Sequence, residues 1–176
     1  ILHDILTYTE TYGYEYLGTA AQALAGMVML ARGNLRAGIH TILERMAIFK
    51  RKGKRYHLMT FQYLLGKVYF EMVVQRGRMS LSLIAKNLLF LIRHRPFAAR
   101  NAEKSFKEAV TMAESMGAMG VAGQIHFDLA QLYAAQRKTQ LARGSAERCI
   151  AIFQACDANV YLEKAEAFVR RHRLTT

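Results

Sequence analysis

The side chains best suited to chemistry in this sequence are two cysteines, six histidines and several carboxylates. Cys149 and Cys156 are seven residues apart in a strongly helical stretch, which places them about 10 Å apart along one helix. This separation is too long for a disulfide bond, so we expect buried free thiols in a reducing compartment. The histidines are scattered without metal-ligand spacing, at His3, His40, His57, His94, His126 and His172. We therefore expect no metal site.

Known catalytic motifs are also missing from the sequence. It contains neither a glycine-rich phosphate loop with its lysine nor a nucleophile elbow. Acidic residues near lysines, such as Glu103 with Lys107 and Glu163 with Lys164 and Glu166, fall on the expected outer faces of helices. We therefore expect binding rather than enzymatic activity, with no catalytic residue and no cofactor.

Positive charge is concentrated in one part of the chain. The 176 residues carry 25 Lys or Arg and 13 Asp or Glu, a net charge of +12. Residues 45–100 contain 13 of the basic residues and one acid, Glu71, so the other 120 residues carry 12 of each sign. A basic patch is expected at Lys50, Arg51, Lys52, Lys54 and Arg55. Some of these cations suit a helix C-terminus, and the excess predicts a phosphate-rich or acidic partner. A solvated basic face without a ligand is the alternative.

The composition indicates a folded helical protein. A hydrophobic content of 52% excludes a disordered basic tail. The longest nearly uncharged apolar run, residues 19–31, is shorter than the roughly 20 residues of a membrane-spanning helix. Helix-forming residues are abundant and no segment alternates apolar and polar residues, which predicts an all-α fold. The chain begins at Ile1 without a methionine or a leader, so we expect a piece of a longer, cytoplasmic protein.

Small residues recur at two fixed intervals. Gly26 and Gly66 are 40 residues apart, as are Gly117 and Asp157, whereas Gly66 and Ala130 are 64 apart. These intervals predict 40-residue repeats with one insertion of 24 residues. We expect a single domain over 1–176, with repeats at 15–54, 55–117 and 118–157, an insertion at 74–97, a truncated helix at 1–12 and a capping helix at 158–172. The paired helices are expected at 15–32, 35–52, 55–75, 98–116, 119–136 and 139–156.

The residues within these units resemble the tetratricopeptide repeat (TPR) family. The first-helix signature reads Leu65-Gly66 with Tyr69, and again Leu129-Ala130 with Tyr133. The second-helix signature reads Ala102, Phe106 and Ala109. The resemblance implies an α-solenoid of antiparallel helix pairs, in which small side chains allow close approach and large ones fill the grooves.

The insertion resembles one subfamily of these proteins. It carries Lys86-Asn87 and then Phe90-Leu91, and the next helix leads into Met116-Gly117-Ala118. This combination is similar to the C-terminal repeat region of large bacterial signalling proteins that join a class III adenylate or guanylate cyclase domain to an ATPase module. The resemblance implies a sensor or scaffold arm without catalysis of its own.

The TPR pattern also implies a binding groove on the inner side of the first helices. Its lining residues would be Tyr63, Lys67, Phe70, Gln124, Phe127 and Gln131. Aromatic rings with one lysine and two glutamines suit an extended or helical peptide. The alternative is that these side chains pack against the next repeat.

The helix expected at residues 80–92 is apolar on nearly every side. One stripe consists of Leu81, Ile84, Leu88 and Leu91. A helix of this kind must be covered on two sides, which predicts contact with a second copy, an adjoining domain or an anionic membrane surface. Absorption into the domain's own core is the alternative.

These observations predict a protein-binding or peptide-binding module, a scaffold or sensor within a larger signalling protein. Two other functions remain open. The basic segment 45–100 suits nucleic acid or anionic lipid, and the inserted helix suits homodimerisation.

Overall fold

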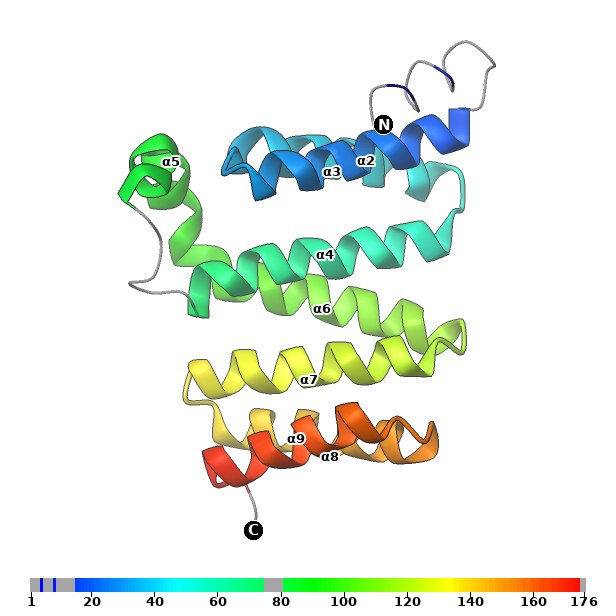
Figure 1. The fold of residues 1–176 in the computed structure, drawn as a ribbon, viewed down its shortest axis with the longest axis vertical. Coiled ribbons are helices and arrows are strands. Elements are labelled where there is room, and N and C mark those ends of the chain that lie inside the picture. Colours follow the sequence, from blue (N-terminus) through cyan, green and yellow to red (C-terminus); the bar gives the residue numbers. More distant parts are fainter. Residues whose placement is uncertain (1–3, 5–7, 9–14, 75–80, 175–176) are drawn as a thin grey trace. The chain divides into compact units, whose positions relative to one another are not determined.

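The computed structural model describes Asp4, Tyr8 and residues 15–74 and 81–174, with the backbone alone for 15–17, 81–84 and 95 (Figure 1). Every regular element in this part of the chain is helical, which confirms the all-α prediction there. The elements are α2 (Glu15–Ala31), α3 (Leu35–Arg51), α4 (Arg55–Val74), α5 (Leu81–His94), the 3-10 helix η1 (Arg95–Phe97), α6 (Ala98–Ser115), α7 (Met119–Ala135), α8 (Thr139–Ala155) and α9 (Asn159–His172). The truncated helix expected at 1–12 lies outside the described residues, apart from Asp4 and Tyr8.

Five turns between consecutive helices share one geometry. Their central residues have left-handed φ angles, at Gly33 (76°), Gly53 (65°), Gly117 (70°), Arg137 (60°) and Asp157 (52°). The N–H of each following residue donates to the carbonyl five positions back, at 2.8–2.9 Å, as in Asn34 to Met29 and Lys138 to Tyr133. This is the Schellman arrangement, which satisfies carbonyls at the helix end. These turns recur every 20 residues, except for the 64 residues between Gly53 and Gly117.

The described helices fall into two compact units, and the single domain expected over 1–176 stays a prediction. Unit 1 comprises Ile1–Phe61 and Gly77–Pro96. In it α2 and α3 run antiparallel and approach closely at glycines (Figure 1). A Cβ added to Gly26 would lie 2.9 Å from Ile42 Cγ1, so only a glycine fits there without movement. Phe49 closes this core by stacking on Phe61, with ring centroids 5.7 Å apart.

Unit 2 comprises Gln62–Arg76 and Phe97–Thr176. The helices α6, α7, α8 and α9 follow one another in antiparallel order (Figure 1). Two buried phenylalanines fill the places that glycines leave open. A Cβ on Gly66 would lie 2.5 Å from the Phe106 ring, and one on Gly123 would lie 2.6 Å from the Phe153 ring. Large side chains therefore pack directly on bare backbone, as the sequence pattern predicts for close helix pairs.

No helix in the described part of the chain combines the length and the apolar character needed to cross a bilayer.

Candidate functional site

Asp128 on α7 is the centre of a polar cluster in unit 2. Its side chain is only 2% exposed. The Tyr63 hydroxyl donates to Oδ2 at 2.6 Å, and Lys67 Nζ donates to Oδ1 at 3.1 Å. Gln131 Nε2 also approaches Oδ1, at 3.5 Å. Three of the six residues predicted for the groove therefore converge on a buried carboxylate that sequence reasoning did not single out.

The protonation of this cluster follows from its burial. Loss of solvent raises the pKa of Asp128, and the hydrogen bond from Tyr63 and the charge of Lys67 oppose this rise. Burial also raises the pKa of the Tyr63 hydroxyl, and the neighbouring carboxylate adds to the effect. Tyr63 therefore keeps its proton and acts as a donor. The arrangement can hold the Lys67 ammonium in place, and the Lys67 side chain is 37% exposed.

The other predicted groove residues differ in their surroundings. Phe70 is buried, and its ring centroid lies 6.2 Å from that of Phe106, so it belongs to the core. Lys67 Nζ lies 5.7 Å above the Phe70 ring. Phe127 is partly exposed and meets the ring of Phe168 on α9 edge to face, at 5.6 Å between centroids. Gln124 is partly exposed on α7. The surface that remains accessible is thus mainly polar.

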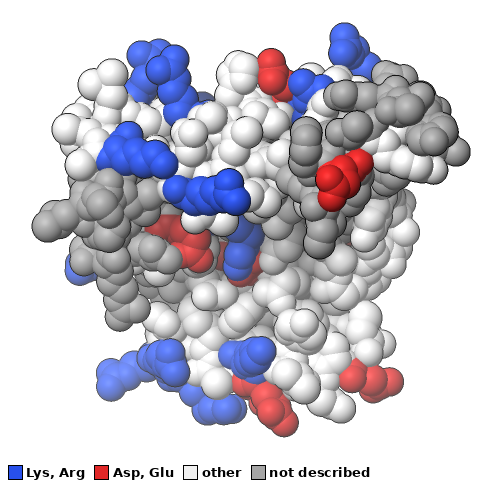
Figure 2. All heavy atoms as spheres, turned by 45° about the horizontal axis from the view of Figure 1, so that its top comes forward, with Lys and Arg blue, Asp and Glu red and all other residues white. Residues whose placement is uncertain are grey.

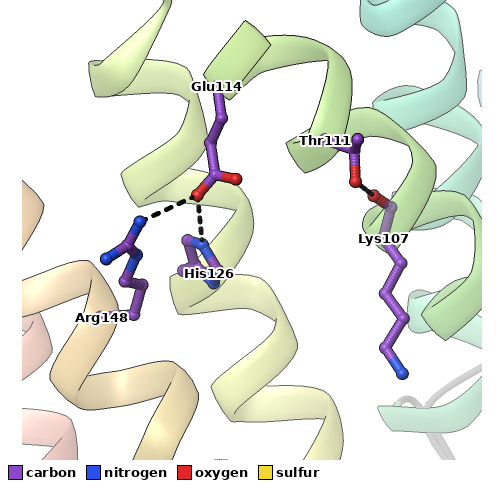
Figure 3. Close-up of polar contacts among 5 residues, drawn as sticks. All are labelled: Lys107, Thr111, Glu114, His126 and Arg148. Carbon is purple, nitrogen blue, oxygen red and sulfur yellow. Dashed lines mark hydrogen bonds and ion pairs between the residues drawn. The ribbon is translucent and has the colours of Figure 1, made fainter.

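A second polar cluster joins three helices of unit 2 (Figure 3). His126 Nε2 on α7 lies 3.3 Å from Glu114 Oε1 on α6, and Arg148 Nη2 on α8 donates to the same oxygen at 3.5 Å. Burial lowers the pKa of His126, and the hydrogen bond with Glu114 opposes this effect. Figure 3 also shows Thr111, whose hydroxyl donates to the Lys107 carbonyl at 2.9 Å within α6. The contacts of Glu114 with His126 and Arg148 tie α6 to α7 and α8.

The predicted basic patch surrounds the turn between α3 and α4. All five of its side chains are exposed, namely Lys50, Arg51, Lys52, Lys54 and Arg55. The pKa of the neighbouring His57 is lowered by burial and further by the charge of Lys54, so the imidazole responds to this positive potential. Figure 2 shows Lys and Arg side chains at the surface of the viewed face, among uncharged atoms and some acidic side chains. A ligand for the patch stays a prediction.

The inserted helix α5 contacts unit 1 through a buried asparagine. Asn87 Oδ1 accepts the Leu35 N–H at 3.1 Å, and Asn87 Nδ2 donates to the Gly33 carbonyl at 2.6 Å. Asn87 also has non-helical dihedral angles, φ −120° and ψ 16°. Both bonds reach the turn between α2 and α3, so one side chain fixes α5 to that turn.

The predicted apolar stripe of α5 divides between two environments. Leu91 is buried, whereas Leu88 is 51% exposed. The side chains of Leu81 and Ile84 lie outside the described residues. The stripe was predicted from an ideal helical period, whereas the backbone at Asn87 departs from helical dihedral angles; a role of the stripe as an interface stays a prediction.

Among the described residues, no group of three His, Cys, Asp or Glu side chains is placed to hold a metal ion. Both cysteines are free. Cys149 is buried, which raises the pKa of its thiol to about 12. Cys156 is exposed, so the expectation of two buried thiols is correct for Cys149 only.

No protein-family model matches the sequence, and no curated protein matches it significantly.

Proposed function

We propose that this chain is a TPR-like α-solenoid module that binds a protein or peptide segment and carries out no catalysis of its own. A packing contact that recurs at the repeat intervals supports the fold. Gly26 faces Ile42 in unit 1, and Gly66 faces Phe106 in unit 2. The two glycines are 40 residues apart, and their partners are 64 apart, which equals one repeat plus the insertion. Both intervals are those expected if the two helix pairs are repeats of one structural unit.

The binding function rests on one observation, the buried Asp128 carboxylate that holds Tyr63 and Lys67. Burying a carboxylate with a cation usually contributes less to stability than an apolar pair of similar size would. A role in recognising a partner would explain why a buried carboxylate and a lysine occupy this place rather than two apolar side chains. With its direction set by Asp128, the partly exposed Lys67 ammonium can donate to a backbone carbonyl or a carboxylate of a bound peptide. The amides of Gln124 and Gln131 supply further donors and acceptors on α7.

The proposed partner is therefore an extended or helical peptide with an acidic or carbonyl group for Lys67. The resemblance of the insertion to cyclase and ATPase signalling proteins supports the proposal that this module is a scaffold or sensor arm of a larger bacterial protein in the cytoplasm. Binding at the module would then be transmitted to neighbouring domains.

The test uses an immobilised peptide array followed by fluorescence anisotropy with the tightest peptide. Lys67→Met keeps the aliphatic stem and removes the ammonium, so we expect affinity to fall about tenfold, as for loss of one charged hydrogen bond. Lys104→Met is the matched control, because Lys104 is an exposed cation on α6 in the same unit. Thermal unfolding of both variants checks the fold. Equal affinities for Lys67→Met and wild type, or an array without binding, would contradict the proposal.

A further inference from the structure

We propose that the outward face of α5 docks on the surface of an anionic lipid bilayer. Three large aliphatic side chains are exposed on this face, namely Leu88 (51% exposed), Leu89 (84%) and Ile92 (65%). They lie within five consecutive positions of one helix. Exposed aliphatic residues gathered in this way mark a surface that is covered in the functional state.

The opposite face of α5 is already occupied. Asn87 and Leu91 are buried, and Asn87 is hydrogen-bonded to both Gly33 and Leu35. Lys86 Nζ adds a contact with the Arg32 carbonyl at 3.4 Å. These bonds fix the helix to the α2–α3 turn, so it does not need to rotate or unfold to present Leu89 and Ile92.

Exposed cations lie on α5 and at the turn to which it is bonded. Lys86 and Arg93 are exposed on α5 itself, and Arg32 and Arg36 are exposed at the turn and at the start of α3. The sequence has no Asp or Glu at residues 16–43 or 81–94, the described segments that form this region. Unit 1 as a whole carries 12 Lys or Arg against 4 Asp or Glu, a net charge of +8. The complementary surface must therefore be both apolar and negative.

An anionic bilayer meets both requirements. Aliphatic side chains enter the boundary between headgroups and acyl chains, while flanking Lys and Arg side chains meet the negative headgroups. A second copy would bring like cations together around the same face. Nucleic acid offers charge but gives leucine and isoleucine no comparable apolar region. A folded acidic protein would need a groove that matches the convex surface of α5. A fluid bilayer needs no such groove.

The experiment is co-sedimentation of the 176-residue chain with two kinds of vesicle, phosphatidylcholine alone and phosphatidylcholine mixed with phosphatidylserine. We expect at least about tenfold stronger partitioning to the anionic vesicles, because several cations each favour that surface. The double variant Leu89→Ser/Ile92→Ser is expected to lose about tenfold or more of this partitioning. Leu141→Ser/Val160→Ser is the matched control, since both residues are exposed aliphatics in unit 2. It should partition like wild type.

Several outcomes would overturn the proposal. These are equal partitioning to both vesicles, no partitioning to either, or the same loss in the control as in Leu89→Ser/Ile92→Ser. Light scattering provides a further check. A doubled mass that falls to the monomer value in Leu89→Ser/Ile92→Ser would assign the face to a second copy. The peptide proposal involves Lys67 of unit 2 and is tested by another assay, so the two can fail separately.

Discussion

Replacing Gly66 by alanine tests whether bare backbone at this position is required for the helix pair. The added Cβ would lie 2.5 Å from Phe106 Cδ1 and 2.7 Å from its Cε1. Carbon atoms prefer a separation of about 3.5–4.0 Å, so the overlap is about 1 Å. Phe106 is fully buried and cannot turn into solvent. Overpacking of this kind typically costs about 1–3 kcal/mol.

Gly144 provides the matched comparison for this cost. It lies in the interior of α8, and nothing lies within 4 Å of the position of an added Cβ. Both substitutions gain the same helix propensity, about 0.5–1 kcal/mol, so this gain cancels between the two variants. The free energy of unfolding should therefore be about 1–3 kcal/mol lower for Gly66→Ala than for Gly144→Ala.

Urea unfolding and calorimetry measure this difference. For a chain of this length, it corresponds to a Tm about 2–12 °C lower for Gly66→Ala than for Gly144→Ala. The recurring contact also predicts that Gly26→Ala is less stable than Gly144→Ala, because its Cβ would lie 2.9 Å from Ile42. Equal stability of Gly66→Ala and Gly144→Ala would refute the requirement for bare backbone at this helix contact.

Three further predictions concern the polar and thiol groups. Asn87→Ala leaves two backbone groups of the α2–α3 turn without their partner and should lower the free energy of unfolding by about 1–3 kcal/mol in urea titrations; an unchanged midpoint would contradict the docking role. Because burial lowers the pKa of His126 below its usual 6.5, its stabilising contribution is full above that pH and is lost as the pH falls through the lowered value. The free energy of unfolding should therefore fall less in His126→Gln than in wild type between about pH 7 and pH 5. An equal or larger fall in the variant would contradict the lowered pKa. The buried Cys149 thiol has its pKa raised to about 12, whereas Cys156 is exposed, so Ellman's reagent should modify one thiol in the native protein and both in denaturant. Retention of full reactivity in Cys156→Ser would contradict this assignment.

The helix boundaries could be predicted closely because the turns carry a local chemical signal. Seven expected helices agree with the observed ones within one residue at each end, and the inserted helix agrees within two. Gly53, Gly117 and Asp157 adopt left-handed conformations, which glycine favours and aspartate tolerates. Arg137 adopts the same conformation although the residue type does not predict it. The left-handed conformation costs a residue such as arginine about 1–2 kcal/mol. The 20-residue spacing of the turns is the signal that could have identified it.

Asp128 could not be placed from the sequence because its partners are distant along the chain. Tyr63 precedes it by 65 residues and Lys67 by 61. A clue was nevertheless present, because Asp128 is the only Asp, Glu, Lys or Arg in α7. An isolated acid in an otherwise uncharged helix must face solvent or a partner, and the packing of α4 on α7 decides between them.

The inserted helix shows why hydrophobic pattern alone does not determine which face of a helix is buried. The apolar pattern predicted one stripe containing Leu88 and Leu91, on a helix that must be covered on two sides, and did not decide which side faces the rest of the chain. The α2–α3 turn, however, leaves the Leu35 N–H and the Gly33 carbonyl to be satisfied, and the Asn87 amide satisfies both at once. Because two buried hydrogen bonds stabilise this orientation, Asn87 turns inward and Leu89 and Ile92 must turn outward. The exposed apolar face of α5 is thus a direct consequence of how its polar residue is bonded.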